Sequence, residues 1–524
     1  MRIAGLLQDA GVPPGVVAVV PTADPASWFD AVADHSAVPR RRPVTSVLET
    51  TSFIGGTWTT RSATEPIHVT SPASGAAIGT AWTATADDID HAVAAARRGQ
   101  VTLEAMTGHE RAALLHRAGD LMGRHIDELA GAITLEQGKP VHESREEVEE
   151  TIGNLRMAAE DVKRFDSAVI PAEARGKSVL TFHRANGVFA VITPWNFPLM
   201  IPSELVAPAL ATGNSVVLKP SEHTPLIAGR LVEILAEAGF PSGSVNLVNG
   251  GRTTGERLVT HPGVDAIAFV GSHPTADTIV RAAGLKRTLI EASGNGPLIV
   301  LDDADVPRAA AAAVAGATFL AGQVCVATER VLVEASVHDE FVRAVLAAAK
   351  DVVLGDPSVD GTTMGPLNNE TTAARMDRHL ADARARGAKV LLGGGRAPGF
   401  PTDLYYELTV VDAVSSEMML FREESFGPVV PITAFRTDDE AIAMANDSHL
   451  GLQAAVFTSS LPRAFRFMHE IRAGNIQINE STGYWEGRPP FGGAAGTQSG
   501  WGRLQLGDFA DLRTVTVDWN PTGG

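Results

Sequence analysis

The fold is decided by residues 216–248, whose sequence is VVLKPSEHTPLIAGRLVEILAEAGFPSGSVNLV. Val216–Leu218 is a short apolar run, and the turn-forming residues Lys219-Pro220-Ser221 follow it directly. A helical pattern extends from about Pro225 to Ala238, and Val245–Val248 is a second apolar run. Strand, helix and strand at this spacing predict two parallel strands joined by a covering helix.

The same alternation continues toward the C-terminus. Ala266–Val270 is a predicted strand that ends at Gly271-Ser272 before another helix, and Leu298–Leu301 is a further apolar strand. By contrast, Ser167–Arg184 and Thr514–Trp519 alternate apolar and polar side chains, as exposed edge strands do. These two segments have no partner strand nearby in the sequence, so we expect them to pair between domains or subunits.

Length and charge limit the function. A chain of 524 residues is too long for one core, so two or three domains are expected. The net charge of −18 is the opposite of the clustered basic surface that binds nucleic acid, so nucleic acid is not an expected partner. A small cofactor phosphate stays compatible, because backbone N–H groups at helix N-termini can bind it.

The cysteine count and the apolar runs bear on location. Cys325 is the only cysteine, so the chain has no intramolecular disulfide, which fits the reducing cytoplasm. The N-terminus has Arg2 and a short apolar stretch before Gln8, which is not typical of a signal peptide. The longest uncharged run, Ala309–Thr328, is mostly Ala and Gly with Gln323 inside it. It predicts a buried helix that leads into a loop, not a membrane span.

An internal repeat distinguishes the N-terminal region. Residues Leu7–Val20 resemble Leu235–Val248 at seven matching positions, which include Gly11, Pro13 and Gly15. Residues 1–48 therefore look like an extension with a partial copy of a helix-turn-strand unit. The alternative is chance similarity between two amphipathic helices with their turns.

Three polar residues are candidates for catalysis. Cys325 is a candidate nucleophile, because a thiolate is the strongest side-chain nucleophile near neutral pH; the alternative is a small buried apolar residue. Glu291 ends an apolar run before a glycine-rich turn, where partial burial would raise its pKa and make it a general base; the alternative is a solvated turn. Asn196 lies in a turn held rigid by Pro194 and Pro198, which suits an oxyanion donor, although the turn could simply be well packed.

Taken together, the chain from about residue 50 to 520 resembles the aldehyde dehydrogenase superfamily. Seven segments occur in that family's order: 194–198 (PWNFP), 218–222 (LKPSE), 269–272 (FVGS), 291–297 (EASGNGP), 322–325 (GQVC), 423–428 (EESFGP) and 490–493 (PFGG).

The resemblance implies an α/β fold with a Rossmann-type cofactor domain, an α/β catalytic domain and a small β oligomerisation element. The implied boundaries are 49–164 and 185–291 for the cofactor domain, 292–495 for the catalytic domain, and 165–184 with 505–524 for the oligomerisation element. It also implies a homodimer or homotetramer, in which the C-terminal strand near Val515 joins a neighbour.

The resemblance implies oxidation of an aldehyde to a carboxylic acid. Cys325 would attack the aldehyde, and the Asn196 side-chain amide with the Cys325 backbone N–H would hold the oxyanion. Glu291 would activate the water that hydrolyses the resulting thioester. Two alternatives are an enzyme that passes the acyl group to coenzyme A, and a structural protein without activity. Retention of Glu291 argues against the first, and retention of all three residues argues against the second.

The resemblance also assigns cofactor and substrate residues. The positions implied for NAD, with NADP possible, are Trp195, Lys219, Ser221, Glu222, Gly251, Gly255, Gly271, Ser272, Ala292, Glu424 and Phe426. Glu222 favours NAD, because a carboxylate at the ribose repels a 2′-phosphate. The substrate positions are Phe197, Glu204, Val324, Trp485 and Phe491.

The substrate itself is not determined by these residues. An acid at Glu204 would favour a cationic or hydroxylated aldehyde, whereas Arg488 nearby has the opposite charge. In the glutamate motif, Ser293 replaces a usual glycine and adds a Cβ to a tight turn. The histidines lack metal-ligand spacing, so no metal is expected.

Overall fold

The structure is a computed structural model that describes residues 48–61, 64–502 and 504–519. The repeat proposed at Leu7–Val20 lies outside the described residues. Its counterpart lies inside them. Helix α8 (Pro225–Glu237) has Ala238 as its C-cap residue. Gly239 then takes a left-handed conformation with φ of 93°, and β10 (Val245–Leu247) follows. The helix and the strand expected from this stretch are therefore both present.

The first of two large sheets has eight strands, and its central five are parallel. In spatial order the strands are β20 (Gly500–Trp501), β12 (Arg287–Ala292), β11 (Ala266–Gly271), β8 (Val188–Ile192), β9 (Ser215–Lys219), β10, β2 (Phe53–Ile54) and β3 (Thr57–Trp58). The strands β8 to β12 are almost wholly buried. Burial on both faces is typical of a parallel sheet covered by helices.

Eight helices belong to this part of the chain. They are α3 (Ala86–Ala105), α4 (Gly108–Arg124), α5 (Ile126–Gln137), α6 (Val141–Val162), α7 (Met200–Ala211), α8, α9 (Arg252–Thr260) and α10 (His273–Ala283). Apolar residues of α4, α6, α7 and α8 form one core with the sheet, and α3, α9 and α10 form a second. The predicted α/β class is confirmed.

The second large sheet has seven strands and its own apolar core. Its order is β15 (Lys389–Leu392), β16 (Thr409–Asp412), β17 (Val429–Phe435), β14 (Thr328–Glu334), β13 (Gly296–Val300), β18 (Gln453–Phe457) and β19 (Asn475–Ile478). Its helices are α11 (Val306–Thr318), α12 (His338–Ala348), α13 (Glu370–Ala385), α14 (Met419–Arg422), α15 (Asp438–Asn446) and α16 (Leu461–Glu470).

The uncharged run Ala309–Thr328 forms most of α11 and then a 3₁₀ turn at Phe319–Gly322, as expected of a helix leading into a loop. Most of its residues are buried. Within the described part of the chain, no helix is long and apolar enough to cross a membrane.

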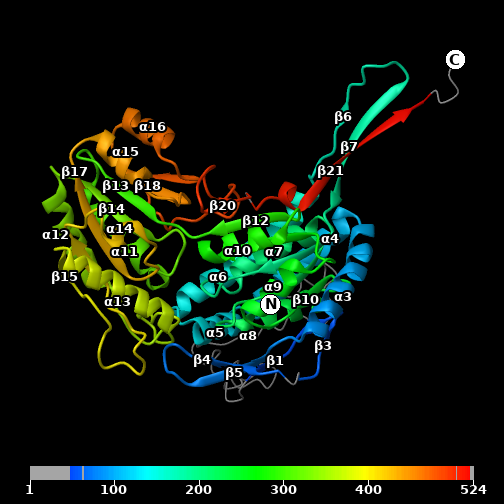
Figure 1. The fold of residues 1–524 in the computed structure, drawn as a ribbon, viewed down its shortest axis with the longest axis horizontal. Helices are drawn as coiled ribbons and strands as arrows, with labels where there is room; N and C mark the ends of the chain where they lie inside the picture. Colours follow the sequence, from blue (N-terminus) through cyan, green and yellow to red (C-terminus); the bar gives the residue numbers. More distant parts are fainter. Residues whose placement is uncertain (1–47, 62–63, 503, 520–524) are drawn as a thin grey trace, which may run out of the picture. The chain divides into compact units, whose positions relative to one another are not determined.

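Two small sheets complete the described chain. One contains β1 (Leu48–Thr50), β5 (Ala77–Trp82) and β4 (Pro66–Thr70). The other contains β21 (Ala510–Asp518), β7 (Lys177–Ala185) and β6 (Val169–Ile170), in that order. Figure 1 shows β7 and β21 running side by side, away from the helices. The two segments expected to be edge strands thus pair with each other, and β21 keeps one edge unpaired within the described residues.

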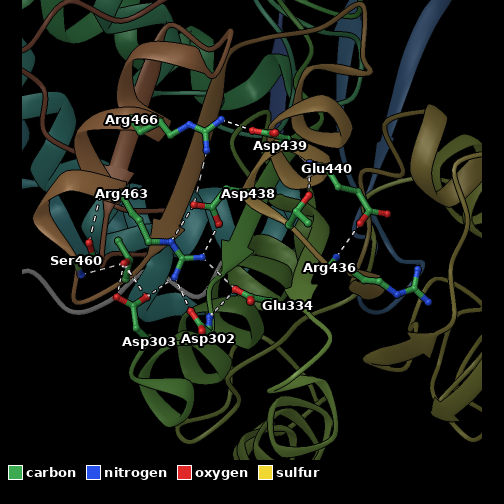
Figure 2. Close-up of polar contacts among 12 residues, drawn as sticks. Asp302, Asp303, Glu334, Arg436, Asp438, Asp439, Glu440, Ser460, Arg463 and Arg466 are labelled. Carbon is green, nitrogen blue, oxygen red and sulfur yellow. Dashed lines mark hydrogen bonds and ion pairs between the residues drawn. The ribbon is translucent and has the colours of Figure 1, made fainter.

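Charged side chains tie α15 and α16 to the seven-stranded sheet. Figure 2 shows Arg463 of α16 at the centre of four carboxylates, those of Asp302, Asp303, Glu334 and Asp438. Its side chain is 23% exposed. β13 and β14 end near this guanidinium, and α15 and α16 begin near it. Arg463 therefore links four elements at one point.

Candidate active site

The thiol of Cys325 and the carboxyl of Glu291 lie in direct contact, although they come from different sheets. Cys325 is half-buried on the loop that leads into β14, and Glu291 is buried near the end of β12. The interaction between the thiol and the carboxyl lowers the pKa of Glu291 and raises that of Cys325. A Cβ added to Gly294 would lie 1.8 Å from the Cys325 carbonyl oxygen. Only glycine lets the two backbones approach this closely.

Asn196 lies beside the same loop. It lies in the turn between β8 and α7 and is 3% exposed. Its side-chain Nδ2 donates to the backbone carbonyl of Gln323, two residues before Cys325, at 3.1 Å. The amide is therefore adjacent to the thiol loop, and its second N–H stays available for another acceptor.

Burial and clustered carboxylates keep protons on this site. Burial raises the pKa of Glu291 to about 8, and the charges of Glu424 and Glu204 raise it further, against the hydrogen bond from Cys325. Burial likewise raises the pKa of the Cys325 thiol well above its ordinary value, and the nearby carboxylates add to this effect. In the free protein the thiol is therefore protonated and needs a base.

Ser293 joins the glutamate turn to the Glu424 loop. Its φ of 64° lies in the left-handed region, where a Cβ is unfavourable. The hydroxyl bonds to the Glu424 carboxylate and accepts from the backbone N–H of His273 at 3.3 Å. Glu424 also accepts from the backbone N–H of Gly294 at 2.9 Å. The concern that a Cβ crowds this turn is thus correct, and the hydroxyl has a partner on each side.

The adenosine-side residues converge around the start of α9. Gly251 is the N-cap residue of α9, and a Cβ there would lie 2.7 Å from Oε2 of Glu222. A Cβ at Gly255 would lie 3.7 Å from Cδ of Lys219, whose Nζ donates to the carbonyl of Pro220 at 2.9 Å. Burial lowers the pKa of Lys219 to about 8. Ser221, which accepts from the His223 N–H at 3.2 Å, completes the turn.

The remaining cofactor candidates lie at the ends of β11 and β12, at the N-terminus of α10, and in the segments after β8 and before β17. Gly271 ends β11, and Ser272 is the N-cap residue of α10 without a side-chain cap. The Trp195 ring packs edge-on against Phe426, with ring centroids 5.6 Å apart. Ala292 is fully buried at the end of β12.

Three of the five substrate candidates line one cavity. Glu204, Trp485 and Phe491 line a cavity of about 460 Å³. By contrast, Phe197 and Val324 are buried in the core and are not among the described residues that line it. Phe197 packs on Phe319, with ring centroids 6.0 Å apart.

The match to known proteins agrees with this geometry. The model of the Aldehyde dehydrogenase family matches residues 58–515. The chain belongs to the aldehyde dehydrogenase family. A mitochondrial succinate-semialdehyde dehydrogenase of Arabidopsis thaliana is 37% identical over 90% of this chain and 89% of its own length.

Solved structures of aldehyde dehydrogenases and related enzymes superpose closely on this chain. A betaine aldehyde dehydrogenase from Staphylococcus aureus, in complex with NAD⁺, has a TM-score of 0.87 and 32% identity, covering 91% of this chain and 99% of that one. An E. coli NADP-dependent enzyme has a TM-score of 0.87 and 33% identity, covering 90% and 98%. This aldehyde dehydrogenase is thus an NAD(P)-dependent oxidoreductase that converts an aldehyde to an acid. The coenzyme A and structural alternatives are not favoured.

Sequence reasoning missed the buried charges that hold these loops in place. Glu329 of β14 accepts the backbone N–H groups of Ser425 and Phe426, both at 2.9 Å, and so fixes the loop of Glu424. Glu147 of α6 accepts two backbone N–H groups at the start of α7 and pairs with Lys139 at 2.6 Å. The adjacent charges Glu329 and Arg330 inside an otherwise apolar strand were a usable signal. Glu147 lies in an acid-rich helix and gave none.

Across residues 48–61, 64–502 and 504–519, no group of three or more His, Cys, Asp or Glu side chains is arranged to hold a metal ion.

Proposed function

We propose that this aldehyde dehydrogenase acts through Cys325 as nucleophile, Asn196 as oxyanion donor and Glu291 as base. The observation that carries the proposal is the convergence of the three residues: the turn after Glu291 approaches the Cys325 backbone so closely that only Gly294 fits, and the Asn196 amide bonds to the same loop at Gln323. A nucleophile in contact with its base, and a neutral donor beside both, is the arrangement that acyl chemistry requires.

The first step forms a carbon–sulfur bond. The Cys325 thiol proton passes to the Glu291 carboxylate, and the sulfur attacks the aldehyde carbon. The oxyanion that forms meets the second N–H of Asn196 and the Cys325 backbone N–H. Because the thiol has a raised pKa, attack depends on Glu291 being ionised at that moment.

The second half of the reaction releases the acid. NAD(P)⁺, when bound, supplies the hydride acceptor that leaves a thioester on Cys325. Glu291, which holds the thiol proton from the first step, releases it to solvent. It then takes a proton from water, the water oxygen bonds to the acyl carbon, and the carbon–sulfur bond breaks. Glu291 returns the proton to the sulfur, and the carboxylic acid leaves.

The residues around α9 and α10 suit a dinucleotide. Gly251 and Gly255 leave the backbone open beside Lys219 and Glu222, and a Cβ at Gly251 would collide with Glu222. The uncapped N-terminus of α10 at Ser272 suits a pyrophosphate. Trp195, Ala292, Glu424 and Phe426 would then lie on the nicotinamide side.

We propose NAD as the preferred cofactor, with NADP accepted less well. The Glu222 carboxylate is held beside Gly251, where it would meet a 2′-phosphate with like charge. Among the residues proposed for this part of the site, only Lys219 and Ser221, in the same turn, would offset the repulsion between Glu222 and a 2′-phosphate.

The names of the relatives do not settle the substrate. Succinate semialdehyde, in the name of the Arabidopsis relative, carries a carboxylate at its far end. Betaine aldehyde, in the name of the Staphylococcus aureus enzyme, carries a quaternary ammonium group. The charge of the substrate is therefore inferred from the residues that line the cavity of this chain.

We further propose the domain division 49–164 with 185–291, 292–495, and 165–184 with 505–524, and a cytoplasmic homodimer or homotetramer. The two large sheets support the division, because β12 and β13 follow each other in the chain yet belong to different sheets. The unpaired edge of β21 supports assembly. A lone thiol supports a reducing compartment.

The test separates acylation from deacylation. In E291Q both steps lose their base, so the stopped-flow burst of roughly one NADH per site should be slow at neutral pH. It should recover when a higher pH ionises the Cys325 thiol directly, with the acyl group then detectable on Cys325 by mass spectrometry, while steady turnover stays lost. C325A should show neither burst nor adduct. In the unmodified enzyme, deacylation should rise as the pH is raised through about 8, because the base form of Glu291 is present only above its raised pKa. Steady turnover by E291Q at the unmodified rate, or turnover that requires coenzyme A, would contradict the proposal.

A further inference from the structure

The buried end of the substrate cavity holds a carboxylate without a partner. Helix α7 carries Glu204, whose side chain lines the cavity beside Trp485 and Phe491. Its Oε1 is buried and has no hydrogen-bond partner among the described residues. Leaving a buried carboxylate oxygen unpaired is costly, so a ligand group that satisfies it would gain affinity.

The charges nearest to Glu204 are also negative. Burial raises the pKa of Glu204 to about 8, and the carboxylates of Glu150 and Glu147 raise it further. The ammonium of Lys139 lies 2.6 Å from Glu147, and both side chains are fully buried, so that charge is already paired. Above a pH of about 8 Glu204 is ionised, and its charge then favours a cation and opposes an anion at this end of the cavity; a bound cation in turn favours the ionised form.

Two arginines line the same cavity but lie toward solvent. The Arg164 side chain is 70% exposed and lies 4.0 Å from Glu160. Arg488 is exposed as well. Water and salt screen exposed charges far more than buried ones, so these guanidinium groups act weakly at the buried end.

Aromatic rings border the same space. The rings of Trp485 and Phe491 pack edge to face, with centroids 4.7 Å apart at 75°. Aromatic faces attract cations, and Trp does so most strongly. A buried carboxylate beside a tryptophan is a suitable site for an ammonium group.

We propose that this enzyme selects aldehydes with an ammonium group at the end remote from the aldehyde, and that Glu204 is the residue that determines this specificity. The inference rests on the proposed function, because the aldehyde end must reach Cys325. Cys325, Glu291 and Asn196 are not among the described residues that line this cavity, but Cys325 and the cavity residue Phe491 pack against the same apolar core. The charge of Glu204 also contributes to the raised pKa values of Cys325 and Glu291. Above pH about 8, where Glu204 is ionised, a terminal carboxylate would meet it with like charge, so the preference is tested above that pH.

Three aldehydes of similar length test the preference. Trimethylammonio-butanal carries the cation, dimethylhexanal is its neutral carbon isostere, and succinic semialdehyde carries a carboxylate. We expect kcat/KM to fall in that order, by at least about tenfold from cation to carboxylate, as for one interaction with a charged group. In E204Q and E204L the ratio of cation to carboxylate should fall at least about tenfold. E149Q makes the same charge change on an exposed part of α6, and its ratio should match that of the unmodified enzyme.

The outcomes separate this inference from the proposed function. Turnover of the neutral aldehyde without a preference for the cation would overturn the inference and leave the proposed function intact. An equal loss for all three aldehydes in E204Q would show that Glu204 is structural, and would also overturn it.

If none of the aldehydes is turned over, a binding measurement still tests the inference. Titration calorimetry of the C325A variant with butyltrimethylammonium and with butyrate reports affinity alone. Tighter binding of the ammonium ion, lost on adding E204Q, supports the inference. Equal binding of the two ions contradicts it.

Discussion

Ser293 is the residue where this chain departs most clearly from the usual glutamate motif, and its geometry explains what it gains. Its left-handed backbone costs on the order of 1 kcal/mol relative to glycine. In return the hydroxyl links the Glu424 carboxylate to the first N–H of α10, at His273. The side of the site proposed for the nicotinamide ribose is thereby joined to the side proposed for the pyrophosphate.

Replacing Ser293 with alanine should therefore weaken cofactor binding more than chemistry. S293A keeps the Cβ and its strain but loses both hydrogen bonds, so KM for NAD⁺ should rise about tenfold, as for one bond to a charged group. The rate of the acylation burst at saturating NAD⁺ should change little. S293G loses the same bonds but relieves the backbone, so its KM should match that of S293A while it unfolds at higher urea. An unchanged KM in S293A would show that the hydroxyl has no part in binding.

At this scale the sequence predicted which side chains take part in the chemistry. It did not predict where two segments of backbone approach each other closely. The motifs were sufficient to name Cys325, Glu291 and Asn196, because a nucleophile, a base and a donor are recognisable side chains. No sequence pattern indicates that Gly294 must leave room for the Cys325 carbonyl, since that contact joins residues from two sheets. The burial of Phe197 and Val324, both proposed to contact the substrate, was likewise not indicated by the sequence.

Among the elements, α16 is held by charge on one side and by apolar packing on the other. Ala464, Phe467 and Ile471 are buried against the seven-stranded sheet. Arg463 faces four carboxylates, whose mutual repulsion it offsets (Figure 2). Arg466, one turn along the helix, pairs with Asp439 and Glu470 at the exposed surface.

These two arginines form a matched pair for a stability test. R463M leaves Asp302, Asp303 and Glu334 without their cation and leaves Asp438 only Arg466, at 3.9 Å. It should lower the free energy of unfolding by about 2 kcal/mol, below the value for a fully buried pair because 23% of the Arg463 side chain is exposed. R466M removes exposed pairs and should cost less than about 1 kcal/mol. Urea denaturation followed by circular dichroism measures both. Equal losses in the two variants would show that the Arg463 cluster adds nothing beyond a surface ion pair.

The elements themselves were predictable where periodicity was strong. The helix expected at Pro225–Ala238 and the strands around Val216, Val245, Ala266 and Leu298 all appear within one or two residues. The antiparallel pairing of β20 with β12 was not predicted, because a two-residue strand carries no periodic signal. That pairing matters, since it places Gly500 opposite Glu291.

At the scale of the whole molecule, the sheet of β21, β7 and β6 and the residue that follows it present apolar side chains. Nothing in the described part of one chain covers these side chains. Leu512 and Trp519 are 61% and 65% exposed, and Val169 and Ile170 of β6 are 76% and 43% exposed. Nine residues of β21 pair with β7, while its other edge is unpaired within the described residues. An exposed edge strand with apolar neighbours is an aggregation hazard unless another chain covers it.

The proposed assembly follows from covering this edge. A charged residue on the sheet should prevent pairing, so L512D combined with V169D should shift the enzyme to a smaller species in light scattering coupled to size exclusion. V353D places the same charge at an apolar residue that is 50% exposed elsewhere, and should leave the mass unchanged. Because Cys325, Glu291 and Asn196 all come from one chain, the smaller species should still give the NADH burst. A wild-type enzyme that is already monomeric, or a double variant of unchanged mass, would place the subunit contact elsewhere or remove it.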